Sequence, residues 1–281
     1  MAFSQAIAGR SIGDRVILVA VIVCAALWLL PIAWVVLLSF KPNQELMMST
    51  ASALHAPYTT KNYTDVAATS GVLHWFRNSI VVAGSATLVT LIVSSLAGYG
   101  FARTEFPFKR TIFIIVLLGL AVPEQAVIIA RPQMFTEWKM HNTFLALILP
   151  SLSNPFGVFV MTQFFRAIPK ELDEAAMLDN ASRFKIFWRV LLPLTVPAQA
   201  TLGIITFLFY WNDYLWPLIS ATKPEMFTLT VGIASTQTNF AQSEGLGFLM
   251  AQAVVAGLPV FVVYLFFQRY IVQAVAGAAI R

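Results

Sequence analysis

The sequence predicts an all-α, polytopic membrane protein with six transmembrane helices. The first observation is composition, since 58% of the 281 residues are hydrophobic and 11% are charged, which excludes an ordinary water-soluble domain. The second is length, because the apolar residues gather in six runs that each reach the about 20 residues a helix needs to cross a bilayer. We therefore expect residues 1–281 to form a single transmembrane domain.

The six predicted spans are, in order, 16–39, 80–100, 111–130, 144–164, 198–219 and 249–267. Arg10 and Arg15 precede the first run, as in a signal peptide, but the run exceeds the about 7 to 15 apolar residues of a signal peptide's core. We expect it to stay in the mature protein. Prolines inside or near the ends of spans predict kinked helices: Pro31, Pro123, Pro150, Pro155 and Pro217.

Positive charge predicts the orientation of the chain, because loops rich in Lys and Arg are retained in the cytoplasm. With the N-terminus inside, most of the basic residues fall on the cytoplasmic side: Arg10, Arg15, Arg103, Lys109, Arg110, Arg166, Lys170, Arg183, Lys185, Arg189, Arg269 and Arg281. The outer segments carry Lys41, Lys61, Arg77, Arg131, Lys139 and Lys223 together with more acids than bases. Both termini are predicted to be cytoplasmic.

The residue types exclude several classes of site. Cys24 is the only cysteine, so neither an internal disulfide nor a thiolate metal cluster is possible. His55, His74 and His141 lie outside the apolar runs and show no metal-ligand spacing, so we expect no metal site and no catalytic residue. The net charge of +5 is divided by long apolar runs, which argues against nucleic acid as a partner.

Residues 167–197, between the fourth and fifth spans, are predicted to begin with a short helix. Pro169 is a favourable helix opener, and the acids that follow, Glu171, Asp173 and Glu174, suit the positive end of a helix dipole. Ala175 and Ala176 are small, so the helix could lie closely in a groove on another protein while Glu174 offers a carboxylate to a cation. Asp179 and Asn180 are expected to end the helix, since Asn tolerates the left-handed conformation.

The next segment is predicted to form an amphipathic helix near the inner membrane interface. Apolar residues recur at helical spacing, at Phe184, Phe187, Trp188 and Leu191, while Arg183, Lys185 and Arg189 face away. The alternative interpretation of the whole loop is an acidic, solvated connection followed by an interfacial helix. The residues by themselves leave both interpretations open.

This loop resembles the EAA loop of ABC-importer permeases. The resemblance rests on Glu174, Ala175, Ala176, Met177, Leu178, Asp179 and Asn180, followed by Pro193 and Pro197. Asn180 stands where the family usually has Gly, a mild departure that implies a stiffer turn. Other short matches resemble the carbohydrate branch related to the maltose-transporter G subunit: Phe76, Asn78 and Ser79, Tyr99 to Arg103, Phe164 to Pro169, Trp211 to Asp213, Gln268 to Tyr270, and Ala276 to Ala278.

The resemblance implies a type I ABC-importer permease fold in a bacterial inner membrane, carrying a sugar or oligosaccharide. It implies a second homologous permease, two ATPase subunits whose cleft holds the EAA helix, and an extracytoplasmic solute-binding protein that meets loops 41–77 and 221–247. The chain contains no GxxxxGK[ST] motif, so ATP and Mg are expected on the ATPase subunits, with no cofactor in this chain. The chain itself is expected not to be an enzyme.

Polar residues at membrane depth are candidates for the solute path, because they are costly unless they face a bundle interior or water. These are Trp211, Asn212 and Asp213, which interrupt the fifth span, Glu124 and Gln125 in the third, and Asn154 in the fourth. The alternative is that they hydrogen-bond neighbouring helices or carbonyls freed by proline. Small residues of the second span are predicted to pack closely: Gly84, Ser85, Ser94, Ser95 and Gly98.

Two other functions are compatible with parts of the sequence. An ion-coupled secondary transporter would use Asp213 and Glu124 as ion or proton sites. An intramembrane enzyme would need a catalytic pair at membrane depth, and the spans hold no histidine and no HExxH. The sequence identifies neither the solute nor whether its pocket lies in this chain or in a partner permease.

Overall fold

The computed structural model describes residues 12–48, 54–69, 71–240 and 245–279, and within these ranges every regular element is helical. The chain divides into two compact units: residues 1–70 with 236–255, and residues 71–235 with 256–281. Of the residues discussed above, Arg10 and Arg281 lie outside the described ranges, as do parts of loops 41–77 and 221–247. The side chains of Gln125 and of residues 269–279 are likewise not described.

The first unit contains one long apolar helix and short polar ones. Helix α2 spans Ile12–Ser39, α3 spans Asn43–Met48 and α4 spans Lys61–Thr69, and the unit also holds the end of α15 (Leu229–Phe240) and the start of α16 (Leu246–Ala279). A small apolar core joins Leu38 and Leu46 to Leu246 and Met250. Only the last two residues of α2 are buried, so almost its whole apolar surface is left uncovered.

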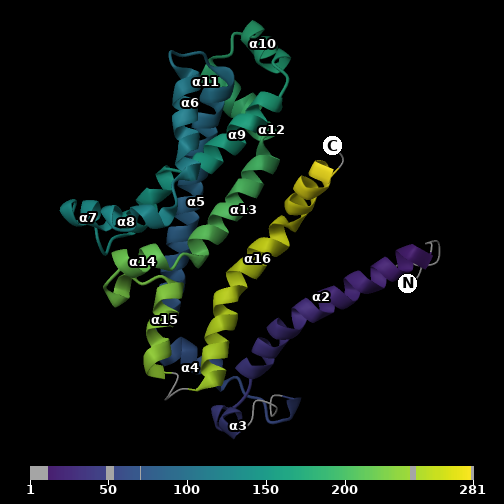
Figure 1. The fold of residues 1–281 in the computed structure, drawn as a ribbon, viewed down its shortest axis with the longest axis vertical. Coiled ribbons are helices and arrows are strands. Elements are labelled where there is room, and N and C mark those ends of the chain that lie inside the picture. The colour runs from purple at the N-terminus through teal and green to yellow at the C-terminus, as the bar shows by residue number, and fades with distance from the viewer. Residues whose placement is uncertain (1–11, 49–53, 70, 241–244, 280–281) are drawn as a thin grey trace. The chain divides into compact units, whose positions relative to one another are not determined.

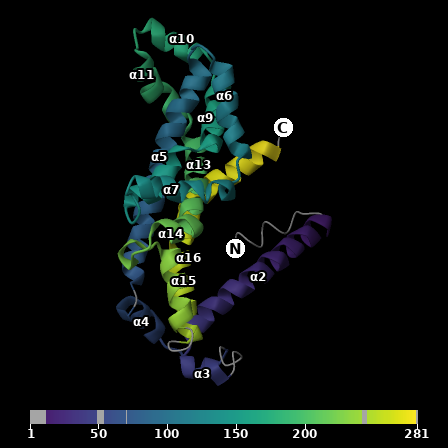
Figure 2. The same ribbon diagram turned by 60° about the vertical axis from the view of Figure 1, so that its left-hand side comes forward.

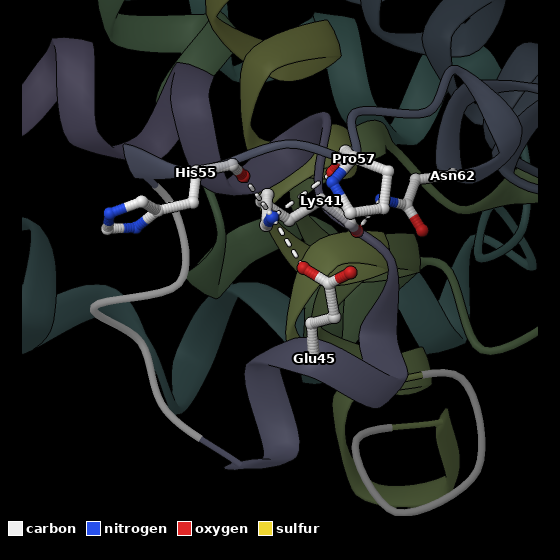
Figure 3. Close-up of polar contacts among 5 residues, drawn as sticks. All are labelled: Lys41, Glu45, His55, Pro57 and Asn62. Atoms are coloured by element: carbon white, nitrogen blue, oxygen red, sulfur yellow. Dashed lines mark hydrogen bonds and ion pairs between the residues drawn. The ribbon is translucent and has the colours of Figure 1, made fainter.

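A fully buried lysine organises the segment after α2 (Figure 3). The Lys41 ammonium donates to Glu45 Oε2 at 2.6 Å, to the His55 carbonyl at 2.6 Å and to the Pro57 carbonyl at 3.1 Å. Asn62 Nδ2 donates to the Lys41 carbonyl at 2.9 Å, which ties α4 to the same point. Because a buried cation is tolerated only when it is paired, these acceptors explain how Lys41 can be enclosed.

The second unit is built around the long helix α5, Val72–Arg103. Helices α9 (Pro155–Ala167) and α13 (Val196–Asn212) pack along it, as Figures 1 and 2 show. One core cluster consists of Met161, Phe165, Ile186, Phe187, Leu191, Ala198 and Leu202. A second core cluster consists of Val82, Phe135, Ala146, Leu147, Trp216 and Ala221.

The remaining elements of this unit are short. They are α6 (Lys109–Leu118), α7 (Ala130–Glu137), α8 (Phe144–Ile148), α10 (Glu171–Leu178), α11 (Arg183–Ile186), α12 (Leu192–Leu194), α14 (Leu215–Ser220), the 3-10 helices η2 (Gly119–Ala121), η3 (Glu124–Val127), η4 (Leu149–Leu152) and η6 (Pro224–Met226), and the π-helix η5 (Phe187–Leu191). Helices α10 and α11 lie at one end of the unit and α14 lies toward the other (Figures 1 and 2).

The described residues contain three helices that are long and apolar enough to cross a membrane, at Ile12–Ser39, Val72–Arg103 and Leu246–Gln268. Two bent pairs add up to two more, Phe144–Leu152 with Pro155–Ala167 at 45°, and Arg183–Leu194 with Val196–Asn212 at 75°. The structure therefore supports three to five of the six predicted spans. Pro150 and Pro155 lie beside the first bend, as their missing N–H groups predict.

The predicted third span, 111–130, is broken more extensively than the single kink expected at Pro123. Helix α6 ends at Leu118, and the chain continues as the short 3-10 segments η2 and η3. Val122 is extended, with φ −84° and ψ 111°, because the ring of Pro123 disfavours the helical conformation in the residue before it.

The small residues of α5 behave in two ways. Ser94, Ser95 and Gly98 are buried, and a Cβ added to Gly98 would lie 2.7 Å from Met161 Cβ, so the close approach to α9 requires glycine here. Gly84 is exposed, and a Cβ there would meet no heavy atom within 4 Å. The prediction of close packing is thus confirmed at Gly98 and wrong, within this chain, at Gly84.

Candidate functional site

The predicted short helix of the loop is present as α10, Glu171–Leu178. Its first turn carries Glu171, Asp173 and Glu174, where carboxylates interact favourably with the free N–H groups at the helix start. Figure 2 shows α10 at one extremity of its unit, followed by α11. The local sequence therefore specifies this helix as expected.

The end of α10 is a Schellman turn centred on Asn180. Asn180 has φ of 54°, its N–H bonds to the Met177 carbonyl at 3.0 Å, and the Ala181 N–H bonds to the Ala176 carbonyl at 3.0 Å. The predicted left-handed conformation of Asn180 is confirmed. This turn sets the direction in which the chain leaves α10.

The two faces of α10 differ sharply. Asp173 is buried, and Ala176 packs against the core cluster that contains Phe165 and Phe187. The opposite face is exposed and bears Glu174, Ala175, Met177, Leu178 and Asp179. Of the two alanines that sequence analysis treated alike, Ala175 is thus available to another protein, whereas Ala176 supports the helix from within.

The segment after the turn buries part of its predicted apolar face in the chain's own core. Ile186, Phe187 and Leu191 are buried in the core, while Phe184 and Trp188 are exposed and stack on each other with ring centroids 6.4 Å apart. The prediction assumed 3.6 residues per turn. Residues Phe187–Leu191 form a π-helix, whose wider turn shifts the phase of the side chains.

Trp211, proposed from the sequence to stack on a solute, is enclosed by the chain itself. It is 2% exposed, its indole N–H donates to the Ala256 carbonyl at 3.1 Å, and its ring contacts Phe76 and Phe207. The side chain therefore joins α13 to α16 in this structure. Its contacts correspond to the packing alternative.

Asn212 and Asp213 lie where α13 ends, at the predicted interruption of the fifth span. Asn212 is exposed and its amide donates to the Leu208 carbonyl at 2.8 Å. Asp213 Oδ1 accepts from the Trp216 N–H at 3.4 Å, and the Asp213 carbonyl accepts from Thr230 Oγ1 at 2.8 Å. Asp213 thus satisfies a free N–H at the start of α14.

Glu124 lies in a charged cluster that includes Asp213 and two residues not predicted from the sequence. Arg131 Nη1 is 3.3 Å from Glu124 Oε1, and the Arg131 guanidinium lies 5.1 Å from the Trp216 ring centroid. Asp213 is linked to this pair through Trp216, whose backbone N–H donates to Asp213 Oδ1 at 3.4 Å. The seven-residue spacing of Glu124 and Arg131 was the only sequence signal for this pair, and it is a weak one.

The other candidates are dispersed. Asn154 Oδ1 accepts from the Gly157 N–H at 2.8 Å and so caps α9. Gln125 belongs to η3, and its side chain is outside the described part of the structure. Among the described residues, no group of three or more His, Cys, Asp or Glu side chains could hold a metal ion.

A cavity of about 290 Å³ lies between α5, α13 and α16 of the second unit. Its lining consists of Thr87, Leu91, Val196, Gln199, Ala200, Gly203, Ile204, Phe207, Val263 and Phe267. None of the predicted solute-path residues belongs to this lining. With two polar side chains among ten, the cavity has the character of a site for an apolar group.

Comparison with known families and proteins places these features in context. The family described as "Binding-protein-dependent transport system inner membrane component" matches residues 90–277. The arabinooligosaccharides transport system permease protein AraQ of Halalkalibacterium halodurans is 30% identical over 89% of this chain and 90% of its own length. The trehalose/maltose transport system permease protein MalG of Thermococcus litoralis is 31% identical over 94% and 96% of the two chains.

The fold is similar to that of a solved structure. A chain of a bacterial ABC transporter involved in the import of the acidic polysaccharide alginate superposes with a TM-score of 0.77 at 19% identity, covering 93% of this chain and 98% of that chain. At this identity the likeness concerns the fold. It agrees with the helical architecture described above.

Proposed function

This chain belongs to the family of binding-protein-dependent transport system inner membrane components, and on that premise we propose that it is the permease subunit of an ATP-driven sugar importer. The cargo class is supported by the relatives, whose names refer to arabinooligosaccharides and to trehalose and maltose. The observation that carries the mechanism is α10, a short helix with one face packed on the chain's core and the other exposed. Movement of a partner seated on the exposed face would thereby reach the membrane helices.

The proposed assembly contains this chain, a second homologous permease, two ATPase subunits and an extracytoplasmic solute-binding protein. ATP and Mg are bound by the ATPase subunits, and this chain performs no covalent chemistry. Residues 1–281 cross a bacterial inner membrane six times with both termini in the cytoplasm, and the broken segment 109–130 provides the third crossing. Loop 167–197 then faces the ATPase, and loops 41–77 and 221–247 face the binding protein.

The exposed face of α10 suits insertion into a cleft. Ala175 allows close approach, Met177 and Leu178 offer apolar contact area, and Glu174 offers a carboxylate to a basic partner. The Schellman turn at Asn180 gives the helix a defined end, so less conformational entropy is lost on docking. Glu174, Ala175, Met177 and Leu178 are the proposed contact residues. Ala176, Asp179 and Asn180 set the shape of the coupling loop.

For the solute path, we propose the charged cluster of Glu124, Arg131 and Asp213 in place of Trp211. Around Trp216, Glu124 and Asp213 supply acceptors and Arg131 supplies donors, a combination that suits the hydroxyl groups of a sugar. Asn212 is exposed beside them, whereas Trp211 is enclosed. We assign the path to this cluster with Asn212, and we assign packing and capping roles to Trp211 and Asn154. Gln125 remains a predicted path residue, adjacent to Glu124.

Co-purification of the importer tests the docking claim. The double variant Glu174→Lys with Ala175→Arg places bulky cations on the exposed face and should abolish both association with the ATPase subunit and sugar uptake. The control Glu105→Lys alters an exposed side chain whose ion pair with Lys109 contributes little, and it should leave both intact. If the double variant assembles and transports like the wild type, α10 is not the docking element.

Reconstitution of the chain distinguishes an ATP-driven importer from an ion-coupled secondary transporter. The chain reconstituted alone in proteoliposomes should show no uptake under a proton or sodium gradient. Gradient-driven uptake that requires Asp213 or Glu124, without ATP, would instead support a secondary transporter.

A further inference from the structure

The C-terminal end of α5 holds the loop on both sides of α10. On one side, Arg103 Nη2 donates to the Ile168 carbonyl at 2.5 Å, and Arg103 Nη1 lies 3.5 Å from Asp173 Oδ2 within α10. On the other side, Tyr99 Oη donates to the Arg183 carbonyl at 3.3 Å. Tyr99 and Arg103 are four residues apart and therefore share one face of α5.

The Arg103–Asp173 pair is almost fully withdrawn from solvent. The two side chains are 5% and 10% exposed, respectively. Within the described part of the chain, Arg103 Nε and Asp173 Oδ2 have no hydrogen-bond partner. Burying such a pair costs desolvation energy that its attraction barely offsets, so a contribution to net stability explains it poorly. Fixing the position of α10 against α5 explains it better.

Tyr99 makes the second attachment rigid. Its ring lies 5.9 Å from that of Phe165 and 5.1 Å from that of Phe187, centroid to centroid. Phe165 and Phe187 are buried members of the core cluster on which Ile168, Ala176 and Ala181 also pack. Because packed side chains interlock at crystal-like density, α10 cannot shift without displacing the end of α5.

The opposite end of α5 holds another segment through side-chain bonds to its backbone. Asn78 Nδ2 donates to the carbonyls of Glu225 and Phe227 at 2.9 and 3.0 Å, and Ser79 Oγ accepts from the Leu229 N–H at 2.8 Å. Asn78 and Ser79 are buried. This segment, residues 225–229, belongs to loop 221–247, which the proposed function directs toward the binding protein.

We propose that α5 transmits movement between the two membrane faces of the importer. Arg103 and Tyr99 are positioning residues at its ATPase end, and Asn78 is a positioning residue at its binding-protein end. The 32 residues of α5 form one α-helix about 48 Å long at 1.5 Å per residue, long enough to join the two membrane faces. The inference rests on the proposed function, because it assigns a partner to each end. It adds a path by which docking of a binding protein outside would change ATP hydrolysis inside.

The test uses the complete importer reconstituted in proteoliposomes. Three quantities are measured for each variant: ATPase subunit recovered with the permease, ATP hydrolysis with and without sugar-loaded binding protein, and sugar taken up. Asp173→Asn and Asn78→Ala should both retain the ATPase subunit and unstimulated hydrolysis. Stimulation by the binding protein and uptake should fall by about threefold to thirtyfold, the range typical of residues that couple two sites.

The controls are chosen to separate coupling from folding. Glu105→Gln removes an exposed carboxylate near the same end of α5 and should change none of the three quantities. A third variant, Arg103→Ala, removes the other partner of the buried pair. If it fails to assemble with the ATPase subunit, the charge-swapped variant Arg103→Asp with Asp173→Arg tests whether an ion pair at this position restores coupling. If the swapped variant assembles and the binding protein again stimulates ATP hydrolysis at least in part, transmission through α5 is supported. If it assembles but hydrolysis is not stimulated, the proposal is overturned.

Other outcomes also overturn the proposal. Wild-type stimulation in both Asp173→Asn and Asn78→Ala would show that α5 does not transmit the signal. Loss of the ATPase subunit in Asp173→Asn, with α10 still folded, would make the pair part of docking rather than transmission. Failure of the proposed function is distinguishable, because the wild-type chain itself would then retain no ATPase subunit.

Discussion

Helices α2 and α5 look alike by hydropathy and differ in what surrounds them. Their most apolar 18-residue stretches have mean hydropathies of 2.9 and 2.1, and both helices are long enough to cross a bilayer. Yet no residue of that stretch is buried in α2, against 33% in α5. High hydropathy therefore predicts that a helix can cross a membrane, but it does not predict whether other helices pack on it, because lipid is as apolar as a leucine side chain.

What distinguishes α5 is the combination of small and polar positions on one face. Gly98, Ser94 and Ser95 allow close contact with neighbouring helices, and Asn78 and Arg103 attach each end to a loop. The two helices thus differ in how much of their surface the rest of their own unit covers, and the predictions below test that difference.

The largest expected effect comes from removing a buried aromatic ring of α5. Phe101 is 8% exposed and its ring lies 5.0 Å from that of Phe113, so Phe101→Ala should destabilise the folded chain by about 3–5 kcal/mol. Trp28 of α2 is 80% exposed, and Trp28→Ala should remain within about 0.5 kcal/mol of the wild type. Thermal unfolding of the purified chain in detergent measures both, and equal losses would contradict the comparison.

A smaller effect is expected from adding one methyl group to α5. At Gly98 the new Cβ would lie 2.7 Å from Met161 Cβ and 2.9 Å from the Met161 carbonyl carbon, so Gly98→Ala should cost about 1–3 kcal/mol.

The matched control lies on the same helix. Gly84 has open space around it, so Gly84→Ala should be neutral or should stabilise the helix by about 0.5–1 kcal/mol through reduced backbone entropy in the unfolded chain. The two melting temperatures should move in opposite directions or differ clearly. A loss at Gly84 as large as that at Gly98 would show that another surface covers Gly84 under the conditions of measurement.

The smallest effect concerns the turn that returns the chain from α10 toward α5. Asn180 has φ of 54°, so Asn180→Ala should cost about 1–2 kcal/mol, the penalty of a left-handed conformation for a residue with a Cβ and no local hydrogen bond. Asn180→Gly should be close to neutral. Protease resistance of loop 167–197 in the intact chain reports the change, and greater sensitivity of the glycine variant would contradict this account.

Local features of the sequence determined much of the architecture. Unbroken apolar length predicted spans at 16–39, 80–100 and 249–267, and each lies within a longer helix of the structure, at Ile12–Ser39, Val72–Arg103 and Leu246–Ala279. Helix-terminal preferences predicted α10 and the left-handed Asn180. The polar residues Asn212 and Asp213 correctly indicated the end of α13. These outcomes share a cause, because each depends on interactions between residues that are neighbours along the chain.

Only the tertiary structure decided which side chains meet across the chain. The Arg103–Asp173 pair, the enclosure of Trp211, and the contrast between Gly98 and Gly84 all depend on where another helix passes. Packing also selected the buried face around the π-helix Phe187–Leu191, where Ile186, Phe187 and Leu191 all lie in the core. Residue spacing specifies the face of an ideal helix, but the free energy of packing against neighbouring helices selects the face that is buried.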